Sequence, residues 1–229
     1  MLYGAEPELL AALARLRRLC QASRDLNFPL LFDAEQSSRQ PAVHLIARKL
    51  QSEFNRDGAV VIYDTLQMYL LEASSRLEEA LESARRGGYT CAIKLVRGAY
   101  ISQENTLGTV HCSKEATDAS YDAAAHRLLQ AAADRSNGEP DVALLIATHN
   151  RASLQRAAGE MERLGLARSD SRIHFAQILG MVDNLTSALG LAGYNASKLV
   201  VFGEMREVLP WLLRRVEENK DAFGSQASE

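Results

Sequence analysis

The chain has 229 residues, of which 47% are hydrophobic and 24% charged, and its formal net charge at pH 7 is −3. This composition is ordinary for a globular domain with a substantial core, and neither the charge nor any motif indicates nucleic-acid binding. The three cysteines, Cys20, Cys91 and Cys112, include no Cys-x-x-Cys pair. We therefore expect free thiols rather than a disulfide framework or a zinc site.

Short apolar runs rich in β-branched residues predict buried strands, which lie in chain order at 29–32, 59–63, 91–96, 142–147, 173–178 and 198–202. Helical periodicity predicts helices at 6–20, 40–55, 66–86, 116–135, 152–165, 184–193 and 204–219. No low-complexity segment or linker interrupts this alternation. We therefore expect a single α/β domain over residues 1–229, with a disordered tail at 224–229.

The polar residues that follow these strands help to choose between two α/β architectures. Six βα units fit either an open doubly wound sheet or a (β/α)8 barrel that lacks two units. An open sheet concentrates its ligand groups near one switch point, whereas a barrel gathers them from many strands around one mouth. Here the polar residues come from several strands: Asp33, Asp64, Arg97, Thr148, His149 and Gln177. Since no Gly-x-Gly-x-x-Gly follows the first strand either, these positions favour a (β/α)8 barrel that lacks two units.

Two adjacent arginines, Arg214 and Arg215, lie in the last predicted helix. Guanidinium groups suit bidentate binding of a carboxylate. Adjacent helical residues point about 100° apart, so both can reach one ligand only if the helix lies across the site. The alternative is a solvated helix face on which they pair with Glu217 and Glu218.

Asp33 and Lys94 lie on or beside predicted strands. Asp33 directly follows the first strand, where its carboxylate can orient an arginine or cap the next helix. Lys94 interrupts an otherwise apolar strand, and a buried cation needs a partner or ligand. The alternatives for Lys94 are a Schiff-base nucleophile and a side chain that reaches the solvent at an exposed edge.

Three further segments have the chemistry of a cofactor site. In the loop at 97–100, Gly98 permits close approach of the backbone to a ligand, and Arg97 suits a phosphate. His149, at the end of its strand, suits a cofactor contact or proton transfer, and the neutral amide of Gln67 suits the edge of a heterocycle. The other histidines lack metal-ligand spacing, so we predict no metal site.

Together these segments resemble the proline dehydrogenase family, in its eukaryotic-like branch. The matching pieces occur in the family's order. They are Phe32-Asp33-Ala34-Glu35-Gln36, Lys94-Leu95-Val96-Arg97-Gly98-Ala99-Tyr100, Glu115-Ala116-Thr117-Asp118 with Tyr121, Ala147-Thr148-His149-Asn150, Gln177-Ile178-Leu179-Gly180-Met181 and Glu207-Val208-Leu209-Pro210-Trp211-Leu212-Leu213-Arg214-Arg215.

The resemblance implies a distorted (β/α)8 barrel that binds FAD non-covalently and oxidises L-proline or trans-4-hydroxy-L-proline to the pyrroline-5-carboxylate product in proline catabolism. It also implies a quinone electron acceptor, peripheral membrane association and a mitochondrial location, with the targeting sequence upstream of this chain.

The resemblance also assigns roles to residues. Asp33 and Lys94 are expected to be catalytic, with Asp33 beside the arginine clamp and Lys94 near the reactive edge of the flavin. Arg214 and Arg215 are expected to bind the substrate carboxylate, and Leu199 to contact the substrate. The expected FAD contacts are Gln67, Val96, Arg97, Gly98, Ala99, Tyr100, Thr148, His149 and Gln177.

The sequence departs from the family pattern in three places. No counterpart of an upstream active-site lysine precedes Asp33, which indicates that the missing strands are N-terminal. Leu199 replaces an active-site tyrosine of proline-specific members, and Trp211 replaces a tyrosine of the arginine helix. Two alternatives therefore stay open: an inactive truncated form or pseudoenzyme that serves as an interaction module, and a Schiff-base enzyme built on Lys94.

Overall fold

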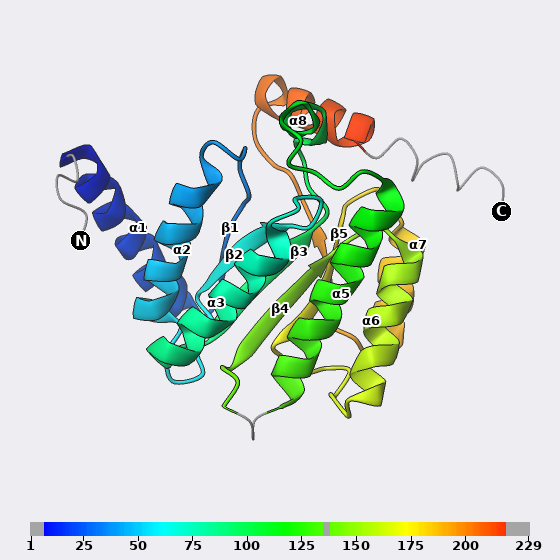
Figure 1. The fold of residues 1–229 in the computed structure, drawn as a ribbon, viewed down its shortest axis with the longest axis horizontal. Helices are drawn as coiled ribbons and strands as arrows, with labels where there is room; N and C mark the ends of the chain where they lie inside the picture. The colour runs from blue at the N-terminus through cyan, green and yellow to red at the C-terminus, as the bar shows by residue number, and fades with distance from the viewer. Residues whose placement is uncertain (1–6, 135–137, 219–229) are drawn as a thin grey trace. The chain divides into compact units, whose positions relative to one another are not determined.

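The computed structural model describes residues 7–134 and 138–218 of the chain (Figure 1). The chain divides into two compact units, Met1–Leu145 and Ile146–Glu229. The boundary falls inside a strand, so no linker separates the two units. The tail predicted at 224–229 lies outside the described residues.

The described residues form six strands, and hydrogen bonds join them in chain order. The strands are β1 (Leu30–Phe32), β2 (Ile62–Gln67), β3 (Cys91–Val96), β4 (Val142–Ala147), β5 (Ile173–Ile178) and β6 (Ala196–Leu199). The pairs β1–β2 and β2–β3 of the first unit are parallel, as is β5–β6 of the second. Parallel neighbours need a crossover between them, and the helices supply it. The α/β class is therefore confirmed, with six strands where a complete barrel has eight.

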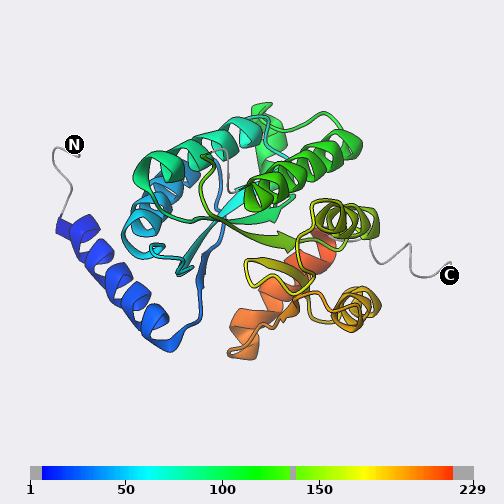
Figure 2. The ribbon, with the colours of Figure 1, turned by 90° about the horizontal axis from the view of Figure 1, so that it is seen from below.

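The helices alternate with these strands. They are α1 (Pro7–Leu26), α2 (Gln40–Phe54), α3 (Ala73–Gly87), α4 (Ile101–Glu104), the 3-10 helix η1 (Asn105–Leu107), α5 (Lys114–Ala133), α6 (Arg151–Arg163), α7 (Asp183–Leu191) and α8 (Met205–Glu218). In the first unit, α3 and α5 lie side by side (Figure 2).

The core of the first unit forms where α1 and α2 meet the start of β2. Leu50, Cys20 and Ile62 are fully buried in one cluster, to which Leu16 of α1 adds its side chain. Burying a leucine stabilises the fold by roughly 1.5–3 kcal/mol. α2 is therefore anchored on α1 and β2, and the loop that carries Asp33 leads into this anchored helix.

In the second unit, α6 buries one apolar stripe. Leu154, Ala157 and Met161 are buried at helical spacing, and Asn150 caps the helix by accepting the Ser153 N–H at 3.1 Å. This cap fixes the chain directly after Thr148 and His149, two of the predicted site residues.

The position of β2 corrects the sequence prediction. A strand was expected at 59–63 and a helix from 66, but β2 runs Ile62–Gln67 and α3 starts at Ala73. The side chain of Asn55 accepts the N–H groups of Val61 and Ile62, each at 2.9 Å, so the paired strand begins later. The strand continues through buried polar residues, which a search for apolar runs does not detect.

β6 also differs from its prediction at 198–202, because it runs Ala196–Leu199. The side chain of Asn195 donates to the carbonyl groups of Asp170 and Ile173, which anchors the chain just before the strand. Phe202 is 91% exposed. The apolar residue at position 202 therefore does not indicate a buried strand.

Candidate active site

Asp33 and Lys94, each predicted to be catalytic, pair with each other in the first unit, whereas the sequence reasoning predicted an arginine as the partner of Asp33. Lys94 Nζ donates to Asp33 Oδ1 at 2.6 Å, and the Lys94 side chain is only 17% exposed while that of Asp33 is 80% exposed. The ammonium is thus largely withdrawn from solvent and the carboxylate faces outward. The alternative that Asp33 caps a helix is wrong, because α2 starts at Gln40 with Arg39 at its N-cap.

The loop after β1 is held by two buried glutamines. Gln40 Oε1 accepts the Glu35 N–H at 2.5 Å, and Gln67 Nε2 donates to the Glu35 carbonyl at 3.0 Å. Gln67 Oε1 also accepts the Ala99 N–H at 3.2 Å. Gln67, predicted as a cofactor contact, therefore ties the loop after β1 to the loop after β3. The bond to Glu35 uses one of its two amide hydrogens.

Glu104, a residue that the sequence reasoning missed, holds the same loop from α4. Its carboxylate accepts the Ser37 N–H at 2.6 Å and the Ser37 hydroxyl at 2.5 Å, and it is 2% exposed. The sequence predicts no helix at 101–113, so nothing in its pattern singles Glu104 out.

Gln40 also contacts a buried histidine, His44, which in turn contacts Asp64. His44 Nδ1 lies 2.7 Å from Asp64 Oδ2, and His44 Nε2 lies 3.1 Å from Gln40 Nε2. Because an amide nitrogen can only donate, His44 Nε2 is the acceptor and Nδ1 carries the proton. Asp64 was expected with the polar residues at the strand ends. It lies instead within β2, 2% exposed, where it faces α2.

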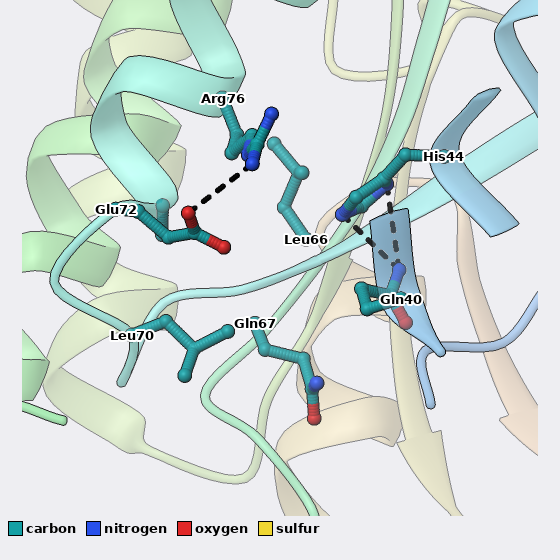
Figure 3. Close-up of a pocket in the computed structure, with 8 residues that line it drawn as sticks. Gln40, His44, Leu66, Gln67, Leu70, Glu72 and Arg76 are labelled. Carbon is teal, nitrogen blue, oxygen red and sulfur yellow. Dashed lines mark hydrogen bonds and ion pairs between the residues drawn. The ribbon is translucent and has the colours of Figure 1, made fainter. Parts of the chain in front are cut away.

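Figure 3 shows the hollow that this network lines, with His44 and Gln40 on one side and Glu72 and Arg76 on the other. Its free volume is about 10 Å³, roughly the minimum that one water molecule needs. An amino acid or a flavin does not fit. The hollow is therefore part of the scaffold under the strand ends, not the substrate site.

The loop after β3 has a backbone that only glycine can adopt. Gly98 has φ +146°, and a Cβ atom there would lie 1.4 Å from the ring of Tyr69. The expectation was that glycine lets a ligand approach. The structure adds a second reason, since the Tyr69 ring packs directly on the glycine. Val96 and Tyr100, on either side of this loop, are half-buried.

Arg97 is fixed by protein groups. Its Nε donates to Asp118 Oδ1 at 2.5 Å and its guanidinium lies 4.4 Å from the centre of the Tyr121 ring. Burial raises the pKa of Asp118, but hydrogen bonds from Lys114 and Arg97 outweigh it and lower that pKa overall. The guanidinium is thus oriented by its neighbours at the C-terminal end of β3.

In the second unit, three of the predicted cofactor residues come together at the ends of β4 and β5. Gln177 Nε2 donates to the Thr148 carbonyl at 3.3 Å and Gln177 Oε1 accepts the Thr186 hydroxyl at 2.7 Å. His149 Nε2 accepts the Ile178 N–H at 3.0 Å, so its proton is on Nδ1. The two strand ends are therefore joined through side chains as well as through the sheet.

The predicted substrate residues also belong to the second unit. Leu199 ends β6 and is 46% exposed. The Arg215 guanidinium lies 5.2 Å from the centre of the Trp211 ring, one helical turn earlier, so it is not simply a solvated charge. Both arginines belong to α8, but the Arg214 side chain lies outside what the structure describes. Their joint binding of a carboxylate stays a prediction.

The donor set of the first unit has the chemistry that suits a flavin dinucleotide. Lys94 and Arg97 bring two cations to β3 and the loop after it, and Gln67 brings a buried neutral amide. Cations match a pyrophosphate or an anionic ring, and amides match the polar edge of a heterocycle. In residues 7–134 and 138–218 there is no group of three or more His, Cys, Asp or Glu side chains placed to hold a metal. No helix in the same ranges is long and apolar enough to cross a membrane.

Comparison with known proteins decides the family. The sequence model described as proline dehydrogenase matches residues 3–227. The chain belongs to the proline dehydrogenase family. Proline dehydrogenase 1, mitochondrial, of Arabidopsis thaliana is 35% identical over 98% of the chain and 46% of its own length. Hydroxyproline dehydrogenase of Mus musculus is 36% identical over 94% of the chain and 48% of its own length. The chain thus spans about half the length of these relatives.

Solved structures of proline utilization A share the fold of this family member. The Bdellovibrio bacteriovorus protein, inactivated by N-propargylglycine, matches 90% of the chain and 21% of its own length with a TM-score of 0.80 and 22% identity. A Bradyrhizobium japonicum mutant, D779Y, matches 95% of the chain and 22% of its own length with a TM-score of 0.77 and 24% identity. The likeness supports the fold class.

Several residues of the site were missed because they are polar residues on buried faces. Gln40 and His44 lie four apart on α2, facing the core. A polar pair at helical spacing among core positions is a signal the sequence does contain. Lys198 and Thr186, which contact the loop after β5, carry no such signal, because their partners are backbone groups or lie on other elements.

Proposed function

We propose that the protein containing this chain is an FAD-dependent dehydrogenase that oxidises L-proline or trans-4-hydroxy-L-proline in mitochondria. Its matched relatives are named proline dehydrogenase, mitochondrial, and hydroxyproline dehydrogenase, at about 35% identity. The observation that carries the proposal is the Lys94–Asp33 ion pair, 2.6 Å long, at the ends of β3 and β1. This pair sits at the strand end where α/β barrels place their chemistry.

FAD, when bound, would supply the group that accepts a hydride from the substrate carbon next to the ring nitrogen. Lys94 holds a positive charge at the position where negative charge builds up during the reaction. Asp33 keeps that ammonium in place. The ion pair also argues against the Schiff-base alternative, because a Schiff-base lysine reacts as a neutral amine, whereas the Lys94 ammonium is held by a carboxylate.

We assign substrate binding to Arg214 and Arg215, which hold the carboxylate, and to Leu199, which forms an apolar wall. We assign FAD binding to residues at or just after strand ends, namely Gln67, Val96, Arg97, Gly98, Ala99, Tyr100, Thr148, His149 and Gln177. A quinone acceptor and peripheral membrane association complete the proposal. The prediction that about two more strands complete the barrel stays a prediction.

The test is to titrate the purified protein with FAD, then add L-proline or trans-4-hydroxy-L-proline without oxygen and follow the flavin absorbance. We expect bound FAD that loses its absorbance on addition of one of the two substrates. Absence of bound flavin at saturating FAD would overturn the proposal. Bound flavin that neither substrate reduces would do the same.

Lys94→Met tests the catalytic role separately. We expect FAD to bind with similar affinity while the rate of flavin reduction falls roughly 10²- to 10³-fold, as when one stabilising donor is removed from an active site. Lys49→Met is a matched control, because Lys49 pairs with Glu53 on the exposed face of α2. Equal rates in the two variants would remove Lys94 from the mechanism.

A further inference from the structure

The turn between β5 and α7 contains a strained backbone. Val182 has φ 46° and ψ 43°, in the left-handed region. Of the residues the structure describes, only Asn27, Asp57 and Val182 combine a side chain with positive φ. Asparagine and aspartate tolerate this region, but a β-branched residue there is a genuine outlier that its surroundings must enforce.

One side chain brackets Val182 on both sides. Lys198 Nζ donates to the Met181 carbonyl at 2.8 Å and to the Ile178 carbonyl at 3.4 Å, and it forms an ion pair with Asp183. An ammonium has three N–H donors, which matches these three contacts. The hydrogen bond from Lys198 lowers the pKa of Asp183. The Lys198 side chain is only 18% exposed, so it reaches the turn from β6 across the protein surface rather than through solvent.

The turn between β5 and α7 also positions a residue of the proposed flavin site. The Val182 carbonyl accepts the N–H groups of Leu185 at 3.0 Å and Thr186 at 3.3 Å, which starts α7. The Thr186 hydroxyl then donates to Gln177 Oε1 at 2.7 Å. A shift of the turn therefore moves Thr186 and releases the orientation of the Gln177 amide, which is 2% exposed.

We propose that Lys198 is a positioning residue that holds Val182 in its strained conformation and thereby orients the Gln177 amide. Its link to FAD rests on the proposed function, since Gln177 is a proposed flavin contact. Lys198 itself touches neither cofactor nor substrate in this proposal. It acts through Val182, Thr186 and Gln177, all in the second unit.

The first test compares Lys198→Met with the wild type by three measurements. Amide hydrogen exchange at Leu185 and Thr186 should become faster, and the dissociation constant for FAD should rise about tenfold, the effect of roughly one hydrogen bond. The kcat of the FAD-saturated variant should change much less than the dissociation constant. Arg163→Met is the control, because the exposed Arg163 side chain pairs only with Glu160, within α6, among the contacts that the structure describes. Unchanged exchange in Lys198→Met would overturn the proposal.

A rescue variant tests the strain itself. Glycine adopts positive φ without a steric penalty, so Val182→Gly in the Lys198→Met background should restore slow exchange at Thr186 and tight FAD binding. Failure to restore either one would overturn the role of Val182. If Lys198→Met does not fold, Lys198→Gln keeps a donor without the charge and should show the same changes at smaller size. Unchanged exchange in that variant would equally overturn the proposal.

The exchange measurement separates this inference from the proposed function. A wild type that binds no FAD would refute the flavin function, and with it the effect on FAD binding. Exchange at Leu185 and Thr186 would still decide whether Lys198 holds the turn.

Discussion

The role of Arg215 depends on the side chains that surround it. Its guanidinium packs over Trp211 at 5.2 Å, which orders a side chain that the sequence alone allows to be solvated. A cation held in this way can receive a carboxylate with little loss of its own freedom.

We expect Arg215→Ala to raise the KM for proline far more than it weakens FAD binding. A charge-assisted hydrogen bond contributes about 1.5–3 kcal/mol, which corresponds to roughly a 10- to 150-fold rise in KM. Steady-state kinetics and an FAD titration measure the two effects. An unchanged KM would return Arg215 to the role of a charge on a helix face.

Gly98 shows a constraint imposed by packing. A Cβ atom at this position would lie 1.4 Å from the Tyr69 ring, and φ is +146°. We therefore expect Gly98→Ala to lower the free energy of unfolding by at least about 1–3 kcal/mol, the usual cost of one strained backbone residue, and to weaken FAD binding. Denaturant unfolding measures the first effect.

Gly159→Ala provides the matched control. Gly159 lies inside α6, and a Cβ atom there meets nothing within 4 Å. Alanine should raise the free energy of unfolding by about 0.8–1 kcal/mol, because it is the better helix former. If Gly98→Ala and Gly159→Ala both raised the free energy of unfolding, the contact between Gly98 and Tyr69 would not be what constrains the loop.

At the scale of elements, α1 and α2 are joined by both a core and an ion pair. Leu16 of α1 packs on the cluster around Leu50, and Arg17 Nε donates to Glu53 Oε2 at 2.7 Å. This hydrogen bond is the main cause that lowers the pKa of Glu53 from its ordinary 4.5 to about 2. Burial opposes the shift, and a hydrogen bond from Lys49 adds to it.

The lowered pKa gives a prediction about acid stability. Because the folded-state pKa lies below the unfolded value, the pair stabilises the fold above about pH 4.5, and this contribution is lost as the pH falls toward 2. The pair is partly exposed, so we expect about 0.2–1 kcal/mol. Glu53→Gln should lower the free energy of unfolding at pH 7 and flatten its fall between pH 4.5 and 2.

Arg17→Met should have the same effect, and the double variant should add little to either single one. Unfolding curves at several pH values measure all three variants. Fully additive losses would show that the two side chains do not act as a pair.

Element boundaries were predictable where apolar runs coincide with burial, as in β3 (Cys91–Val96), β4 and β5, whose predicted and observed bounds agree. The predicted boundaries were wrong where polar side chains determine where a strand begins. The Asn55 side chain accepts the N–H groups of Val61 and Ile62, so β2 begins later than predicted, and Asn195 anchors the chain ahead of β6. The bonded backbone groups lie 6 and 7 positions from Asn55 and 25 positions from Asn195, so the apolar periodicity of the strand does not report them.

At the scale of the molecule, the division into Met1–Leu145 and Ile146–Glu229 predicts unequal local stability. A cavity in one core should open that unit more than the other, because proteins open in cooperative parts. Leu50→Ala, which removes a fully buried side chain of the first unit, should cost about 2–5 kcal/mol. It should speed amide exchange in β2 and β3 more than in β5.

Phe175→Ala is the reciprocal variant, because Phe175 is fully buried in β5 and packs edge-on against Tyr194. It should speed exchange in the second unit more than in the first. Equal acceleration of all strands by both variants would show that the chain opens as a single cooperative unit.

The sequence by itself determined the α/β class, the six strands and the family, because buried strands and family motifs are contiguous in the sequence. Only the tertiary structure decided that Asp33 pairs with Lys94, that Asp64 belongs to a buried histidine network, and that Lys198 reaches the turn at Val182. These contacts join residues 61, 20 and 17 positions apart. Packing of the elements brings such residues together, and local propensity carries no information about it.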